Sequence, residues 1–272
     1  MTMTRRSLPA ALAVLLATAL PAGAETLTIT DRDGAIQSFT QKELLPRATD
    51  TVTLPDALYG KPMTYRVIPL KELLKDTRRA PDDYLAARAA DGFTVPLPGR
   101  LLDPANAAEV EAFLAVEDPA ATWAVLPDNP EKVSAGPFYI VWKLAGSAYV
   151  SREYWSAQLA GLKVVDNPVR KWPGHDVAAS VPAADKLRTG LDRYVSLCIT
   201  CHKLHGEGGA GAAAGPDLAS AKAIDTATLK KWIRSPKSVN LDAKMPKFDD
   251  TALSDDDLDA MIAWLALKAG PR

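Results

Sequence analysis

The fold of the C-terminal part of this chain is decided by one short stretch, Cys198-Ile199-Thr200-Cys201-His202. Two cysteines separated by two residues and followed at once by a histidine form the pattern of covalent haem attachment. Each thiol can form a thioether with a haem vinyl group, and the adjacent imidazole can ligate the iron. The chain has only 2 cysteines, so both belong to this site and a disulfide-rich scaffold is excluded.

Two other kinds of site use the same residue types. A thioredoxin-like dithiol has the same cysteine spacing, but it follows a strand in a βαβ unit, whereas the residues before Cys198 predict an amphipathic helix. A zinc site could combine the motif with His205, but four ligands so close together lack the usual spacer between ligand pairs. The pattern favours haem, and we predict one covalently bound haem c.

The composition is that of a globular protein. Of the 272 residues, 47% are hydrophobic and 24% are charged, which suffices for one large domain or two of medium size and excludes disorder as the main state. The 32 basic and 33 acidic residues nearly cancel, to a formal net charge of -1. The chain therefore lacks the strong positive field that attracts nucleic acid, and we expect no nucleic-acid partner.

Residues 1–24 have the features of a cleaved secretory signal peptide. Arg5-Arg6 precedes an apolar run from Ala10 to Leu20, and the small residues Ala22-Gly23-Ala24 suit a cleavage site. The two arginines partly resemble a twin-arginine signal and also suit a Sec signal, which we favour. After this segment there is no apolar run of the length that a membrane span needs. We predict a periplasmic mature protein without an integral membrane segment.

Residues 183–272 predict a helical domain. Apolar residues from Leu187 to Cys198 recur at helical spacing, so the haem motif ends an amphipathic helix. Apolar residues from Leu258 to Leu265 repeat this pattern after Ser254, the expected N-cap. The two predicted helices enclose the haem motif and the loops that follow it.

Several motifs in this region occur in a specific order. Gly190 and Tyr194 lie on the first helix, Gly215-Pro216-Asp217-Leu218 follows the haem motif, and Lys244-Met245-Pro246 precedes the last helix. In this order they resemble a class I c-type cytochrome, so residues 183–272 are expected to form an all-α cytochrome c domain. The resemblance also implies that Trp264 on the last helix packs against Gly190 and Tyr194.

The same resemblance implies the haem ligands. His202 and Met245 are the expected axial ligands, and the carbonyl of Pro216 is expected to accept a hydrogen bond from the His202 imidazole. Met245 lies in a polar loop where packing alone explains a methionine poorly, whereas Met261 suits a helix core. His205 is the alternative sixth ligand, although from three residues after His202 it would have difficulty reaching the other haem face.

Further residues of this region have two interpretations each. Trp232 and Arg234 occupy positions that in similar cytochromes often lie near a haem propionate, but they also suit simple packing and a solvated charge. Basic residues cluster around the predicted Met245 loop, at Lys230, Lys231, Arg234, Lys237, Lys244 and Lys247. They could steer an acidic redox partner toward the haem, or form only a solvated face.

Residues 25–165 predict an α+β domain with mixed sheets and short helices. Thr26–Thr30 meets the turn Asp33-Gly34, which indicates a β-hairpin. The other predicted strands are Tyr65–Ile68, Phe93–Leu97, Trp123–Leu126, Phe138–Trp142 and Lys163–Val165, and the predicted helices are Leu70–Leu74 and Ser151–Leu159. Residues 166–182 form a proline-bearing linker, where we place the domain boundary.

Parts of this first domain resemble the sulfite-oxidase-like domain of molybdopterin-dependent oxidoreductases. The resemblance rests on Tyr65–Leu70, Asp91–Leu97, Gly136–Val141 and Tyr154-Trp155. In that family a cysteine thiolate ligates molybdenum, and no cysteine lies between residues 25 and 170. The domain also lacks histidine, a phosphate-binding glycine loop and a nucleophile elbow. We therefore expect no molybdopterin.

These patterns predict a monohaem electron carrier rather than a catalyst of substrate chemistry. It would take electrons from a periplasmic dehydrogenase and pass them to an oxidase or another cytochrome, with the N-terminal domain docking one partner. One alternative is a haem-containing subunit or fused form of a sulfite-oxidase-like oxidoreductase, which stoichiometric molybdenum would reveal. Another is an N-terminal domain that serves assembly of a larger complex, which co-purifying subunits would reveal.

Overall fold

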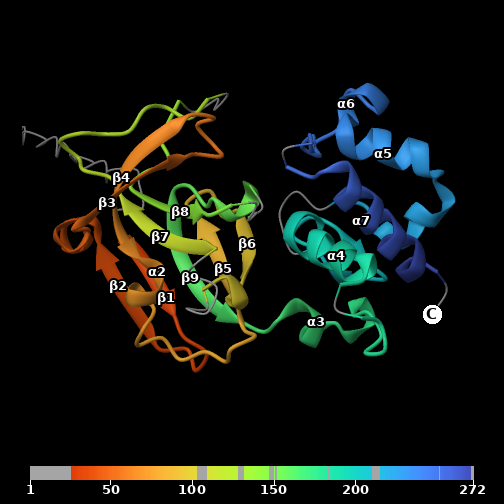
Figure 1. Cartoon of the computed structure of the whole chain (residues 1–272), viewed down its shortest axis with the longest axis horizontal. Helices are drawn as coiled ribbons and strands as arrows, with labels where there is room; N and C mark the ends of the chain where they lie inside the picture. Colours follow the sequence, from red (N-terminus) through yellow and green to blue (C-terminus); the bar gives the residue numbers. More distant parts are fainter. Residues whose placement is uncertain are drawn as a thin grey trace, which may run out of the picture.

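The computed structural model describes residues 26–102, 109–127, 132–146, 150, 152–182, 184–209, 215–250 and 252–270. The predicted signal peptide, residues 1–24, lies outside them. Figure 1 shows a β-rich N-terminal domain and a helical C-terminal domain, joined by a connector that contains α3 (Pro168–Lys171). The mixed-sheet and helical halves that the sequence predicts are thus both present.

The larger sheet of the N-terminal domain has five strands in the order β2-β1-β9-β5-β6. They are β1 (Thr26–Thr30), β2 (Ile36–Thr40), β5 (Tyr84–Ala89), β6 (Thr94–Pro98) and β9 (Leu159–Val165). Only β1 and β9 are parallel, with Ile29 opposite Leu162, and the other pairs are antiparallel. The domain is closed by pairing its first strand with its last.

The smaller sheet has four antiparallel strands in the order β3-β4-β7-β8. They are β3 (Asp50–Pro55), β4 (Pro62–Pro69), β7 (Val110–Val116) and β8 (Phe138–Leu144). Short helices lie between strands: α1 (Gln41–Leu44), η1 (Leu45–Arg47), α2 (Leu70–Leu73), η2 (Gly99–Leu102) and η4 (Arg152–Tyr154). Both sheets contribute to one hydrophobic core, in which Trp142, Tyr65 and Tyr139 are the largest fully buried side chains.

Most predicted elements of this domain are confirmed. The hairpin of β1 and β2 pairs Thr30 with Ile36 across the predicted turn. The strands predicted within β4, β6, β8 and β9 and the helix predicted at α2 are also present. These elements have clear local patterns, because alternating apolar residues bury one face of a strand.

Two predictions for this domain are wrong. Residues 123–126 are not a strand, because the Trp123 N–H donates to the Glu117 carboxylate at 2.7 Å and its ring packs edge-on against Tyr65. In the predicted helix at 151–159, only η4 is helical. Gln158 takes a positive φ of 49° and its N–H donates to the Ala135 carbonyl at 2.7 Å, so the helix cannot continue into β9.

A buried carboxylate ties the smaller sheet together. Asp56 accepts hydrogen bonds from the hydroxyls of Tyr65 at 2.8 Å and Tyr139 at 3.2 Å. The backbone N–H groups of Leu58 and Tyr59 donate to the same carboxylate, each at 2.8 Å. Several donors compensate the charge inside the core, as a buried carboxylate requires. Asp56 therefore serves to hold β4 and β8 together.

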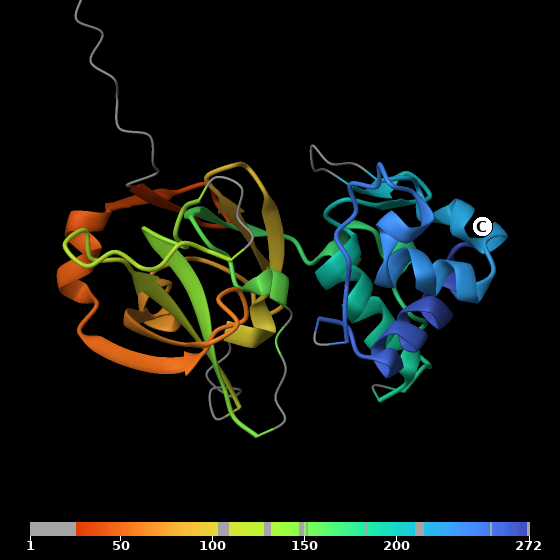
Figure 2. The ribbon, with the colours of Figure 1, turned by 90° about the horizontal axis from the view of Figure 1, so that it is seen from above.

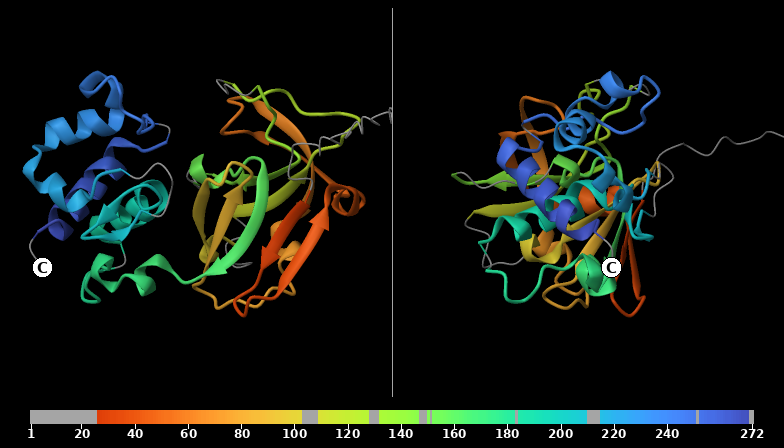
Figure 3. Two further views of the ribbon diagram at one scale, coloured as in Figure 1. Left: turned by 180° about the vertical axis from the view of Figure 1, so that it is seen from behind. Right: turned by 90° about the vertical axis from the view of Figure 1, so that its right-hand side faces the viewer.

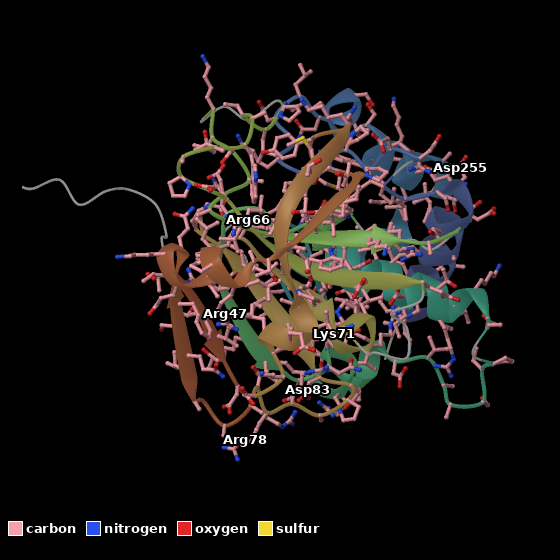
Figure 4. The ribbon with its side chains drawn as sticks, turned by 60° about the vertical axis from the view of Figure 1, so that its left-hand side comes forward. Arg47, Arg66, Lys71, Arg78, Asp83 and Asp255 are labelled. Atoms are coloured by element: carbon pink, nitrogen blue, oxygen red, sulfur yellow. The ribbon has the colours of Figure 1, made fainter. Side chains whose placement is uncertain are left out.

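The connector between the domains packs against both of them. On one side, buried Asp83, which is labelled in Figure 4, accepts hydrogen bonds from Arg32 and, at 2.6 Å, from Arg170 of α3. Burial alone would raise the pKa of Asp83, but these bonds and one from the Ala80 N–H lower it. On the other side, Val177 is buried in the core of the helical domain. Figure 3 shows the connector running from β9 to the helices.

The C-terminal domain is helical apart from one very short hairpin. Its helical segments are α4 (Lys186–Arg193), the π-helical turn η6 (Tyr194–Cys198), η7 (Leu218–Ala223), α5 (Thr226–Arg234), α6 (Pro236–Val239) and α7 (Asp255–Lys268). The hairpin pairs β10 (Lys203–Leu204) with β11 (Glu207–Gly208), and the rest of the described secondary structure of this domain is helical, as expected. Ser254 is the N-cap of α7, as predicted, and accepts a hydrogen bond from the Asp257 N–H.

The close crossing of α4 and α7 organises this domain. The rings of Tyr194 and Trp264 are stacked with centroids 4.6 Å apart. A Cβ at Gly190 would overlap the Ala260 carbonyl oxygen and would lie 2.7 Å from the Cβ of Trp264. Glycine is therefore needed for the helices to approach this closely, and the predicted contact of Gly190 and Tyr194 with Trp264 is confirmed.

We expect Gly190→Ala to destabilise the C-terminal domain by about 1–3 kcal/mol, because the added methyl group must push α7 away. The free energy of unfolding from guanidinium titration measures this loss. Gly270→Ala is the matched control, since a Cβ there meets nothing closer than 3.6 Å. Equal stability of the two variants would contradict this account of the helix crossing.

Candidate functional site

The haem motif lies in one compact turn at the end of the first helix. In η6 the Ile199 N–H donates to the Tyr194 carbonyl at 2.9 Å, a π-helical bond. The N–H groups of Cys201 and His202 both donate to the Cys198 carbonyl, at 3.1 and 2.8 Å. Both thiols and the imidazole are thereby held within a single turn, as attachment to one macrocycle requires.

The two cysteines are free thiols, with Cys198 buried and Cys201 half-buried. Burial, reinforced by the charge of Cys201, raises the pKa of Cys198 to about 12. Burial and the charge of Glu153 raise the pKa of Cys201 as well. Redox-active dithiols need a lowered thiol pKa, and their motif follows a strand. These shifts and the helical position of the motif both oppose the dithiol alternative.

The His202 imidazole is oriented by the loop that follows the motif. Its Nδ1 lies 2.9 Å from the Pro216 carbonyl oxygen, and since a carbonyl can only accept, Nδ1 carries the proton. This leaves the Nε2 lone pair for a metal. A Cβ at Gly215 would overlap the imidazole ring, so only glycine lets the loop come this close. The arrangement fits a haem-ligating histidine.

Asp217 holds this loop in place, a role that sequence reasoning missed. Its carboxylate accepts hydrogen bonds from the N–H groups of His205 at 3.0 Å, Gly206 at 2.6 Å and Ala219 at 2.9 Å. Burial would raise the pKa of Asp217, but these backbone donors lower it. An aspartate that follows Gly-Pro is a common cap of the next turn, and this was the signal available in the sequence.

Met245 lies at the edge of the hydrophobic core of the domain that contains the haem motif. It is half-buried and packs against the cluster of buried residues that contains Cys198 and Ile199. Its two sequence neighbours, Lys244 and Pro246, are exposed. Met245 also lines an open pocket, together with residues of α6 and the loop after it. A thioether at a pocket wall, rather than within a helix core, is available to a ligand.

Arg234 is engaged by the segment between α6 and α7. Its guanidinium donates to the carbonyls of Phe248 at 2.9 Å and Leu253 at 2.6 Å, and to the Asp255 carboxylate at 2.7 Å. It therefore fixes the end of the loop that carries Met245. Trp232 on the same helix is half-buried. The predicted proximity of these two residues to a haem propionate stays a prediction.

His205 is used in the fold of the C-terminal domain. Its Nε2 lies 2.8 Å from the Lys268 carbonyl oxygen at the end of α7. Over the part of the chain that the structure describes, no group of three or more His, Cys, Asp and Glu side chains is arranged to hold a metal ion. The zinc alternative, which needs His205 beside the haem motif, thus finds no support in the geometry.

His175 of the connector also belongs to the surroundings of the site, and sequence reasoning missed it. It lies in η5 (Pro173–His175) and is fully buried. Its ring packs edge-on against Tyr194 at 5.5 Å and Trp264 at 6.4 Å, and its Nε2 lies 3.5 Å from the Glu207 carboxylate. The connector thereby completes the aromatic contact between α4 and α7.

A family model described as cytochrome C oxidase, cbb3-type, subunit III, matches residues 185–265. Residues 185–265 form a c-type cytochrome domain. A domain of this type implies haem c as cofactor and electron transfer as function. No curated protein matches the chain. The match to the family model leaves the N-terminal domain uncovered, so its sulfite-oxidase-like identity stays a prediction.

We expect Gly215→Ala to break the hydrogen bond between His202 Nδ1 and Pro216, because the new methyl group would displace the loop from the ring. The Nδ1–H proton of the cytochrome domain, observed by NMR, should lose its slow exchange with solvent. Pro216→Ala is the matched control, since it keeps the carbonyl acceptor. Slow exchange that survives in Gly215→Ala would contradict this role of the glycine.

Proposed function

We propose that this chain is a periplasmic monohaem c-type cytochrome that transfers single electrons between redox proteins. The observation that carries the proposal is the hydrogen bond between His202 Nδ1 and Pro216, because it orients the histidine of an intact attachment motif as an iron ligand. The match of residues 185–265 to a cytochrome family supports the same conclusion. The two free thiols supply the covalent anchors.

The bound haem would supply an iron that alternates between the ferric and ferrous states. Cys198 and Cys201 would hold the macrocycle covalently, and His202 Nε2 and the Met245 thioether would ligate the iron. A methionine beside a histidine raises the reduction potential relative to two histidines. With both of these iron ligands supplied by the protein, the site would favour outer-sphere electron transfer over binding of a substrate.

Other features of the chain support the proposed location and partners. The signal-like segment at residues 1–24 supports export to the periplasm. Over the described residues, no helix is both long enough and apolar enough to cross a membrane. The matched family is named for a subunit of a cytochrome oxidase, which supports an oxidase or another cytochrome as acceptor. We propose a periplasmic dehydrogenase as donor.

The pocket beside Met245 offers a surface for such partners. Lys237, Lys244 and Lys247 line it and are exposed, as is Leu241 at 86% of its surface. Lys230, another member of the predicted basic cluster, forms an ion pair with Asp259 instead. An exposed apolar side chain within a positive rim is suited to brief docking of an acidic redox protein.

We expect one haem per chain in the pyridine haemochrome spectrum and a methionine–iron absorption band in the ferric protein. Met245→Ala should abolish that band and lower the reduction potential, because the thioether ligand is lost. Met63→Ala, at a half-buried methionine of β4, is the matched control and should keep the band. Absence of covalent haem would refute the proposed function, whereas a band that persists in Met245→Ala would move the sixth ligand elsewhere.

We expect the triple variant Lys237→Glu, Lys244→Glu and Lys247→Glu to reduce the anionic oxidant ferricyanide about tenfold more slowly at low ionic strength. Its reaction with the cationic oxidant hexaammineruthenium should become faster. The control replaces Lys42, Lys61 and Lys75, three exposed lysines of the N-terminal domain, with the same change in net charge. Equal rates for the two triple variants, or rates insensitive to salt, would contradict steering by this rim.

A further inference from the structure

The N-terminal domain rests directly on the helix that ends in the haem motif. Arg100 of η2 forms an ion pair with Asp192 of α4. Tyr84 of β5 packs into the hydrophobic cluster of the cytochrome domain, and burial followed by the charge of Asp192 raises its pKa to about 12. Figure 2 shows η4, in green, on the side of the N-terminal domain that faces the cytochrome domain.

The turn η4 brings a carboxylate to this interface. η4 contacts η6, the turn that contains Cys198. Glu153 in the middle of η4 is half-buried, and burial raises its pKa, although the neighbouring Arg152 partly opposes this. After burial, the charge of Glu153 is the second cause that raises the pKa of the Cys201 thiol. Glu153 is thus an acidic group that the first domain brings to the turn before the haem motif.

The contact between the domains is fixed on two sides. One side is the ion pair of Arg100 with Asp192, which joins the two domains directly. The other side is the connector, where Arg170 binds Asp83 of the N-terminal domain and His175 packs against Tyr194 of the cytochrome domain. A loosely tethered domain would sample many positions, whereas these contacts hold η4 in one place against η6. Any charge on η4 then acts on the haem motif at a constant distance.

We propose that Glu153 belongs to the haem environment and holds the reduction potential of the iron down, so that the N-terminal domain is part of the redox centre. This inference rests on the proposed haem function. When Cys198 carries a thioether, its sulfur is bonded to a carbon of the haem substituent, so η4, which contacts the turn that ends in Cys198, is close to the macrocycle edge. Glu153 would act on the iron through its charge and not as a ligand.

The direction of the effect follows from electrostatics. The ferric centre carries one more positive charge than the ferrous centre, so a nearby carboxylate stabilises the ferric form and lowers the potential. Partial burial limits the screening of this interaction by salt. Arg152, which is exposed, offsets only part of the charge because water surrounds it. The N-terminal domain would in this way set the driving force of electron transfer, a role that docking alone does not explain.

The test is the midpoint potential of the purified holoprotein by spectroelectrochemical titration, at about pH 7 and about pH 9, because a raised pKa moves the ionisation of Glu153 to higher pH. We expect Glu153→Gln to raise the potential and Glu153→Asp, which keeps the charge, to leave it near that of the natural sequence. Glu72→Gln is the matched control, because it removes the same charge from an exposed position on α2 of the same domain.

The outcomes separate this inference from the proposed function. If Glu153→Gln contains a full complement of covalent haem and its potential equals that of Glu72→Gln at both pH values, the inference is overturned and the proposed function stands. If the unmodified protein has no covalent haem, the proposed function fails first. A rise in both variants alike would show a general effect of net charge and would also overturn the inference.

Discussion

The close crossing of α4 and α7 is the contact on which the redox site depends. Gly190 lets the two helices approach, and the stacked rings of Tyr194 and Trp264 fill the space beside the crossing. The haem motif begins at Cys198, the last residue of η6, which continues α4 and starts with Tyr194. A shift of either helix would therefore move the turn that carries both thiols and the imidazole. Close packing of this kind is specific, because the interior tolerates no added volume.

The second constraint is the loop that returns to the motif. Gly215 lies against the His202 ring, the Pro216 carbonyl accepts a hydrogen bond from the Nδ1–H group, and Asp217 secures the loop through backbone N–H groups. Each interaction has a different physical role: steric access, orientation and anchoring. In the same domain, Arg234 fixes the segment that follows Met245. The two expected iron ligands thus lie on separately anchored loops, which restricts the positions that each can adopt.

The sequence predicted local features well and long-range contacts poorly. The haem motif, the N-cap Ser254 and the β1–β2 hairpin depend on residues close in the chain, so short patterns reveal them. The strand predicted at Trp123 is wrong because a carboxylate from Glu117 took the place of a neighbouring strand as hydrogen-bond acceptor. The helix predicted at residues 151–159 is wrong because tertiary contacts hold Gln158 at a positive φ. His175 was missed because its burial depends on aromatic rings from two distant helices.

By itself the sequence determined the attachment motif and the two-domain division, because thiol spacing, hydrophobic periodicity and composition are properties of neighbouring residues. It also indicated Pro216 and Met245, through the order of motifs along the chain. Only the tertiary structure decided what surrounds that motif. The N-terminal domain brings η4 against η6, and the connector brings His175 beside Tyr194. Such contacts join segments that are far apart in the chain, and they exist only when both domains and the connector are packed together.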